Sequence, residues 1–124
     1  MRELKCPAIY KHFKNKYYAT MGVSKPIDSN EVIALCELLE KDPLSMIFMS
    51  AKYTEGNIDI RLLELNGNWY HLEEECKDTL VIYKSLYDGS GAYARPIDMF
   101  VSEVDKDKYP DIEQKYRFEE LGGI

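Results

Sequence analysis

The sequence predicts a mostly β protein with one helix, and three observations support this fold class. Short runs of β-branched and aromatic residues recur along the chain, and such runs suit a pleated, half-buried surface. Turns that contain glycine or asparagine separate these runs. Pro96 stands directly before the last run, where a strand has to turn a corner. We therefore expect a strongly bent antiparallel sheet or an SH3-like partly open barrel. An open meander packed on one helix, an α+β sandwich, is the alternative.

The run Leu80–Tyr87 is predicted to be the central strand of this sheet. Its side chains are largely apolar on both faces of a strand, so we expect both faces to be covered. Residues 88–91 contain two glycines and are predicted to form a turn. Residues 92–95 return antiparallel, and Pro96 lacks the amide donor that a continuing central strand needs. Residues 97–100 are then expected to form a one-turn corner that contributes to the core.

Two strands are expected near the start of the chain, at Tyr10–Phe13 and Tyr17–Val23. Gly22 lies inside the second of these strands and predicts a bulge or a sharp bend there. Residues 24–29 contain Pro26 and are predicted to form a loop. The last part of the chain is expected to hold a strand at 101–104, a short helical turn at 109–114 and an edge strand at 116–121.

A helix is predicted at about residues 29–41. Asp28 is placed to accept from the amides of the first turn. An apolar stripe with helical spacing follows, made of Val32, Leu35, Cys36 and Leu39. Pro43 ends the helix because the residue before a proline is disfavoured in the α region. Cys36 lies on the stripe, and we expect its thiol to be buried and inert.

Three further strands are predicted between the helix and the central strand, at 45–53, 58–65 and 69–72. The alternation of polar and apolar residues slips at Leu62–Leu63, which predicts a bulge. Asn66–Gly67 is a strong signal for a two-residue hairpin turn, because both residues tolerate a positive φ. The middle of the chain is thus expected to be a β-meander that leads into the central strand.

Two segments of the sequence resemble a known bacterial family. The motif VIYKSLY, a glycine turn and ARPIDMF occupy the region around the central strand, and the opening YKHFKNKYY spans Tyr10–Tyr18. With the closing Arg117–Glu119, these motifs resemble the family called domain of unknown function 1653. The resemblance covers residues 10–29 and 78–121 of what we expect to be a single domain, 1–124. It implies that residues 30–77 are a large insertion, and it implies no activity.

Length, charge and cysteine content limit the classes of function. The net charge is −6, which argues against broad nucleic-acid binding because phosphate affinity comes from Lys and Arg. It leaves a local basic face open, and Lys11, Lys14 and Lys16 cluster near the start. The three cysteines are far apart and favour reduced thiols. We expect a cytoplasmic protein, because the chain has neither a signal-type apolar run nor the ~20 apolar residues of a membrane span.

The candidate ligand-binding residues are aromatic, with one histidine and one arginine: His12, Tyr17, Tyr83, Tyr87, Tyr93 and Arg95. Tyrosine combines an apolar ring with a polar tip and suits a half-wet groove. Arg95 is predicted either to fork onto a carboxylate or phosphate of a ligand or to pair with Asp98 or Glu103. No residue is predicted to be catalytic, no metal site is indicated by the two isolated histidines, and no cofactor is expected.

We expect a small soluble binding module with an aromatic groove, more in keeping with the sequence than an enzyme. Its partner is expected to be a small ligand or a peptide, with nucleic acid disfavoured by the net charge and no membrane partner. Two alternatives are kept. One is a small enzyme that uses a histidine or a carboxylate as its acid–base group, and the other is a structural protein whose tyrosines form a homo-oligomer interface.

Overall fold

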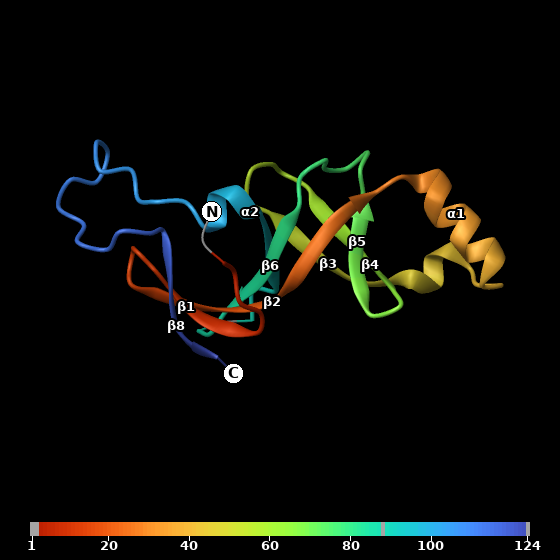
Figure 1. Ribbon diagram of the computed structural model, residues 1–124, viewed down its shortest axis with the longest axis horizontal. Coiled ribbons are helices and arrows are strands. Elements are labelled where there is room, and N and C mark those ends of the chain that lie inside the picture. The colour runs from red at the N-terminus through yellow and green to blue at the C-terminus, as the bar shows by residue number, and fades with distance from the viewer. Residues whose placement is uncertain (1–2, 88, 124) are drawn as a thin grey trace.

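A computed structural model describes residues 3–87 and 89–123 and confirms the mostly β fold. Within these residues, eight strands form one sheet in the order β5-β4-β3-β7-β6-β2-β1-β8. The strands are β1 (Ala8–His12), β2 (Lys16–Ile27), β3 (Ile47–Tyr53), β4 (Asp59–Leu65), β5 (Asn68–Leu72), β6 (Leu80–Ser85), β7 (Ala92–Pro96) and β8 (Phe118–Gly123). Because β5 also pairs with β2, the six strands from β2 to β7 close into a barrel, and β1 and β8 extend it (Figure 1).

The barrel is closed by two parallel pairings that the sequence did not predict. The β2 segment from Ser24 to Ile27 runs parallel to β5, and β3 runs parallel to β7 over Ala51–Tyr53. The predicted loop at 24–29 is therefore wrong for its first four residues. Pro26 is accommodated in this strand opposite His71. The segment 47–72, expected to belong to an insertion, supplies three of the six barrel strands in the described chain.

Strand β6 is covered on both faces, as predicted. Leu80 and Ile82 are fully buried in the barrel interior, where residues from the other strands surround them. Val81 and Tyr83 are buried on the opposite, outer face. The strand ends at Ser85, earlier than predicted, and leaves Leu86 and Tyr87 exposed beyond its end.

An aromatic cluster packs against the outer face of β6. Tyr10 from β1, Phe100 and Phe118 from β8 are buried there beside Tyr83. Phe100 belongs to the short helix α2 (Ile97–Phe100), which is the predicted one-turn corner after Pro96. Phe100 and Phe118 stack at a centroid distance of 4.1 Å. This outer cluster fastens β1 and β8 to the barrel.

Helix α1 (Ser29–Leu38) lies at the end of the molecule opposite β1 and β8 (Figure 1). Asp28 accepts a hydrogen bond from the Asn30 amide at 2.8 Å, as predicted for the cap. The helix ends three residues before the predicted limit, because Glu40 takes a left-handed conformation with φ 55°. A 3₁₀ turn, η1 (Pro43–Met46), then leads into β3. Cys36 is buried beneath the helix, as expected.

Both predicted irregularities in the strands are present. The register of β2 against β6 shifts between Thr20 and Gly22, which confirms the bulge at Gly22. The register also shifts where β3 meets Leu62 and Leu63, but the extra residue is Phe48 on β3. Asn66 and Gly67 both have positive φ, 53° and 82°, as the predicted hairpin turn requires.

The end of the chain differs from the prediction in two of its three elements. Residues 101–104 are not a strand; Glu103 forms only an isolated bridge to Tyr116. Residues 109–114 contain a turn at 110–111 and no helix. The predicted edge strand is present as β8, which pairs with β1. In the described part of the chain, no helix is both long and apolar enough to cross a membrane.

Candidate functional site

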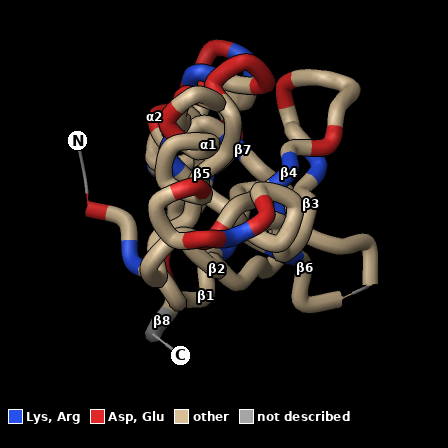
Figure 2. The backbone as a smooth tube through the Cα atoms, turned by 90° about the vertical axis from the view of Figure 1, so that its right-hand side faces the viewer, with Lys and Arg blue, Asp and Glu red and all other residues tan. Residues whose placement is uncertain are grey.

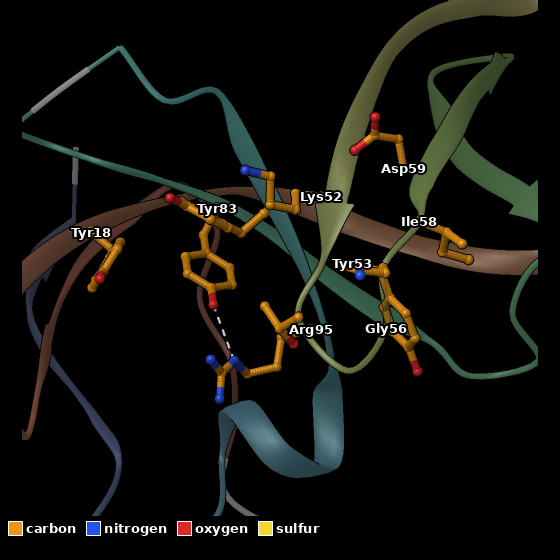
Figure 3. Close-up of a pocket in the computed structure, with 11 residues that line it drawn as sticks. Tyr18, Lys52, Tyr53, Gly56, Ile58, Asp59, Tyr83 and Arg95 are labelled. Carbon is orange, nitrogen blue, oxygen red and sulfur yellow. Dashed lines mark hydrogen bonds between the residues drawn. The ribbon is translucent and has the colours of Figure 1, made fainter.

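A cleft of about 590 Å³ lies on the outer face of the barrel, beside the aromatic cluster. Tyr83 from β6 and Arg95 from β7 line it (Figure 3), and Tyr93 from β7 lines it as well. Tyr18 from β2 lies on one side, and the turn between β3 and β4, at 53–59, lies on the other. Three of the predicted ligand-binding residues therefore converge on one open cavity.

The strand register explains why these side chains share a face. Lys52 on β3 pairs with Tyr93 on β7, and Tyr93 pairs with Tyr83 on β6. Residues that pair directly point to the same side of a sheet, and so do residues two apart on one strand. Arg95 follows Tyr93 by two and therefore joins the row. The neighbouring side chains, Ala92 and Ala94, point into the barrel core instead.

Arg95 is held in a defined orientation by the aromatic cluster. Its Nε donates a hydrogen bond of 3.0 Å to the Tyr83 hydroxyl (Figure 3). Its guanidinium carbon lies 5.6 Å from the centroid of the Phe118 ring, a cation–π geometry. The predicted pairing with Asp98 or Glu103 is absent: among residues 3–87 and 89–123, no carboxylate lies within ion-pair distance of Arg95, and Glu103 pairs with Lys115. The guanidinium thus enters the cleft without an acidic partner from this part of the chain.

The hydroxyls of Tyr83 and Tyr53 stay protonated at neutral pH. Burial raises the pKa of Tyr83, against the lowering effect of the neighbouring Arg95 charge. Burial and contact with Cys76 raise the pKa of Tyr53 to about 12. Neutral hydroxyls both donate and accept hydrogen bonds. The Tyr83 hydroxyl therefore accepts from Arg95 without cancelling its positive charge, whereas the Tyr53 ring packs toward the barrel core.

A second hollow of about 380 Å³ adjoins the cleft. Tyr18 and Tyr93 line both cavities. Lys16, Ser85 and Tyr87 line only the second one, together with Asn15. The two cavities therefore lie on either side of the same pair of tyrosines.

His12 lies behind the cleft rather than in it. Its ring packs against Phe118 at 4.8 Å and against Tyr18 at 6.3 Å, between centroids. Its Nδ1 accepts a hydrogen bond from the Lys14 amide at 3.1 Å. Burial, and then the charge of Arg95, lower the pKa of His12 to about 4. The imidazole is consequently neutral at pH 7, and it contributes no charge to the site.

The sequence identified part of this site and missed part of it. Tyr83, Tyr93 and Arg95 line the cleft, and Tyr87 lines the second hollow. Tyr17 lines neither, and its ring faces Tyr87 at 6.3 Å. The residues that were missed are Tyr18, Lys52 and Tyr53. Lys52 lies near the end of the predicted strand 45–53, close to the turn that follows. Its pairing with Tyr93 on β7 is a long-range contact that the local sequence does not indicate.

The second histidine is buried away from both hollows. His71 is fully buried, and its Nδ1 lies 2.7 Å from the Oγ of Ser24. The backbone of Cys76 and Asp78 lies near the ring, but no described residue is in good hydrogen-bond geometry with its Nε2. Ser24 is also inaccessible to solvent, so this pair has no access to a substrate. Among the described residues, no three His, Cys, Asp or Glu side chains gather in a way that would hold a metal ion, and the three cysteines are free.

Comparison with known proteins supports the resemblance found in the sequence. The family model described as "Protein of unknown function (DUF1653)" matches residues 67–120. The match includes β6 and β7, which carry Tyr83, Tyr93 and Arg95, and the helix α2 that follows them. It also covers residues 67–77, the last eleven of the segment 30–77 that was expected to be an insertion, and it leaves Tyr18 and Lys52 outside. No curated protein and no solved structure matches the chain.

Proposed function

We propose that residues 1–124 form a binding module whose aromatic cleft takes a small ligand, or a segment of a peptide, through an anionic group. The observation that carries this proposal is the convergence of Tyr18, Tyr83, Tyr93 and Arg95 on one cavity of about 590 Å³. A cavity of that volume is within the range of ligand sites, which combine aromatic walls with a few placed polar groups. A cytoplasmic location belongs to the same proposal and is supported by the three free cysteines.

Arg95 is the group that selects the ligand. Its Nε is engaged by Tyr83 and its face by Phe118, so its terminal nitrogens are the donors directed at a ligand. A guanidinium that is already oriented loses less freedom when it binds a carboxylate or phosphate. Lys52 adds a second positive charge at the rim. Half-buried rings of Tyr18 and Tyr93 provide the apolar contact.

The test uses two small aromatic anions, phenyl phosphate and benzoate, with benzyl alcohol as the uncharged comparison. Titration into ¹⁵N-labelled protein should shift the amide signals of residues that line the cleft and the Arg95 Nε–H signal. Arg95→Gln should weaken binding of the anions about tenfold or more, since hydrogen bonds to charged groups contribute about 1.5–3 kcal/mol. Benzyl alcohol should bind the wild type and this variant equally weakly.

Lys41→Gln is the matched control, because Lys41 is exposed at the α1 end of the molecule and its change removes the same charge. It should leave the titrations unchanged. Lys52→Gln is a second test variant at an exposed position, where folding is not at risk. If neither anion shifts the signals of the cleft, or if Arg95→Gln and Lys52→Gln bind as the wild type does, the cleft is not a site for anions.

A further inference from the structure

The cleft and the second hollow adjoin at two shared lining residues, and we call the two cavities together the groove. Tyr18 and Tyr93 line both cavities, so a ligand that fills the first can pass over these rings into the second. The Cα register agrees, because Tyr18 pairs with Ser85 and Tyr83 pairs with Tyr93 on the same outer face. The groove therefore begins at the turn at 53–59 and ends at Lys16 and Tyr87.

The charge of the groove is opposite to that of the whole chain. Three cationic side chains line it in the described structure, Lys16, Lys52 and Arg95, and one acidic side chain, Asp59. The chain as a whole has 16 basic and 22 acidic residues. In Figure 2, where the α1 end faces the viewer, acidic positions lie on that end of the molecule with basic positions among them. The lining of the groove therefore attracts an anionic ligand, although the chain as a whole is acidic.

The groove also offers aromatic rings at separate points along its length. Tyr93 is half-buried between the two cavities and packs against Tyr83, with ring centroids 5.7 Å apart. Tyr87 is 61% exposed at the far end, beside the ring of Tyr17. An exposed tyrosine that has a rigid neighbour is a platform on which a flat ring can stack.

We propose that the ligand of this groove is a short single-stranded nucleic acid, with its phosphates on Arg95, Lys52 and Lys16 and its bases stacked on Tyr93 and Tyr87. This inference rests on the proposed binding function of the cleft and names its ligand class. Single-strand binding proteins combine a basic groove with aromatic rings in this way. The net charge of −6 disfavours broad binding, and it restricts the contact to the few phosphates that the groove accommodates.

The arrangement of strands favours a nucleic acid over an extended peptide. A peptide that adds to a sheet needs an unpaired strand edge for its main-chain hydrogen bonds. The strands beneath the groove, β2, β6 and β7, are each paired on both sides within the barrel. Base stacking and phosphate contacts need only side chains, and the groove presents tyrosine, lysine and arginine side chains.

The test is a fluorescence anisotropy titration with 5′-fluorescein-labelled hexamers of uridylate and thymidylate. Uridine monophosphate and a labelled hexaglutamate peptide are the comparisons. We expect at least one hexamer to bind tenfold or more tightly than the mononucleotide, and hexaglutamate to bind more weakly than either hexamer. The logarithm of the association constant should fall with the logarithm of salt concentration with a slope of about −2, because each of three cations contributes about 0.7 on a single strand.

Two variants at the far end of the groove test whether a long ligand reaches the second hollow, independently of anion binding at Arg95. Tyr87→Ala and Lys16→Gln should each weaken hexamer binding about fivefold or more, and should leave phenyl phosphate binding unchanged. Both positions are exposed, so the fold is not at risk. The controls are Leu86→Ala, which removes an exposed apolar neighbour, and Lys41→Gln, which removes a distant charge. Neither control should change hexamer binding.

The outcomes distinguish this inference from the proposed function. If phenyl phosphate binds at Arg95 but the hexamers bind no more tightly than uridine monophosphate, the ligand is small and the nucleic-acid inference is overturned, while the binding module stands. If hexaglutamate binds most tightly, the partner is an acidic peptide. If neither phenyl phosphate nor any hexamer perturbs the cleft, both proposals fail.

Discussion

Gly22 lies against the indole ring of Trp69 so closely that a Cβ atom at Gly22 would stand 2.6 Å from Cζ3 of the ring. This contact joins β2 to β5, the parallel pair that closes the barrel. We expect Gly22→Ala to lower the free energy of unfolding by about 1–3 kcal/mol, the usual range for overpacking. Urea denaturation measures the change.

A Trp69→Leu background tests the steric origin of that loss. With the ring removed, Gly22→Ala should lower stability by less than half as much, and the double-mutant cycle should report the coupling. Gly67→Ala is the comparison. No neighbouring atom lies within 4 Å of a Cβ added at Gly67, so the only cost of this substitution is the left-handed backbone conformation, with φ 82°. Equal losses for Gly22→Ala in both backgrounds would show that the backbone, and not Trp69, makes glycine necessary.

The buried hydrogen bond between Ser24 and His71 joins the same two strands. Ser24→Ala should lower the free energy of unfolding by about 1–3 kcal/mol, because it leaves a second nitrogen of the buried imidazole without a partner. Ser45→Ala removes an exposed hydroxyl that donates to the Asp42 carbonyl, and it should change stability by less than about 0.5 kcal/mol. Similar urea midpoints for the two variants would contradict this role for Ser24.

Phe118 connects the stability of the outer cluster to the orientation of Arg95. Its ring is buried, stacks on Phe100 and lies under the guanidinium. Phe118→Leu keeps most of the apolar volume but removes the flat face. We expect a loss of about 1 kcal/mol in stability and a several-fold weaker affinity for phenyl phosphate, although Arg95 is retained. Thermal unfolding and the same NMR titration measure the two effects.

The control for that variant is Phe48→Leu, which changes a ring that is 40% exposed and contacts Trp69 at the barrel. It should leave affinity for phenyl phosphate unchanged. An Arg95 signal that responds to the ligand equally in Phe118→Leu and in the wild type would mean that the stacking does not orient the guanidinium.

The features predicted correctly from sequence are those set by local chemistry. The Asp28 cap, the Asn66–Gly67 turn and the proline corner each depend on a few adjacent residues. The central strand was recognisable because apolar residues occupy both of its faces, which only a covered strand tolerates. Such signals do not require knowledge of the partner strand.

The features that were missed depend on contacts between distant segments. Residues 24–27 read as a loop because of Pro26, yet their parallel pairing with β5 makes them a strand. The prediction of Tyr17 rather than Tyr18 in the groove has a related cause. Both faces of β2 are aromatic there, so polarity along the strand does not indicate which tyrosine faces the cleft. Only the pairing of Tyr18 with Ser85 decides it.

The depressed pKa of His12 makes the fold sensitive to mild acid. His12 titrates near 4 in the folded protein, against an ordinary value of 6.5, because it is partly buried and lies near the Arg95 charge. Between these two values the unfolded chain binds more protons than the folded one, so stability rises with pH there and falls as the pH is lowered from 6.5 towards 4. Burial lowers the pKa of His71 as well, and it acts in the same direction.

His12→Gln separates the two histidines. The urea midpoint of this variant should depend less on pH between 6.5 and 4 than that of the wild type, since the contribution of His12 is removed and that of His71 remains. Chemical shifts of the His12 ring protons, followed by NMR from pH 7 downward, should report a pKa near 4 directly. A measured value near 6.5 would contradict both the burial of the His12 ring and the effect of the Arg95 charge on it.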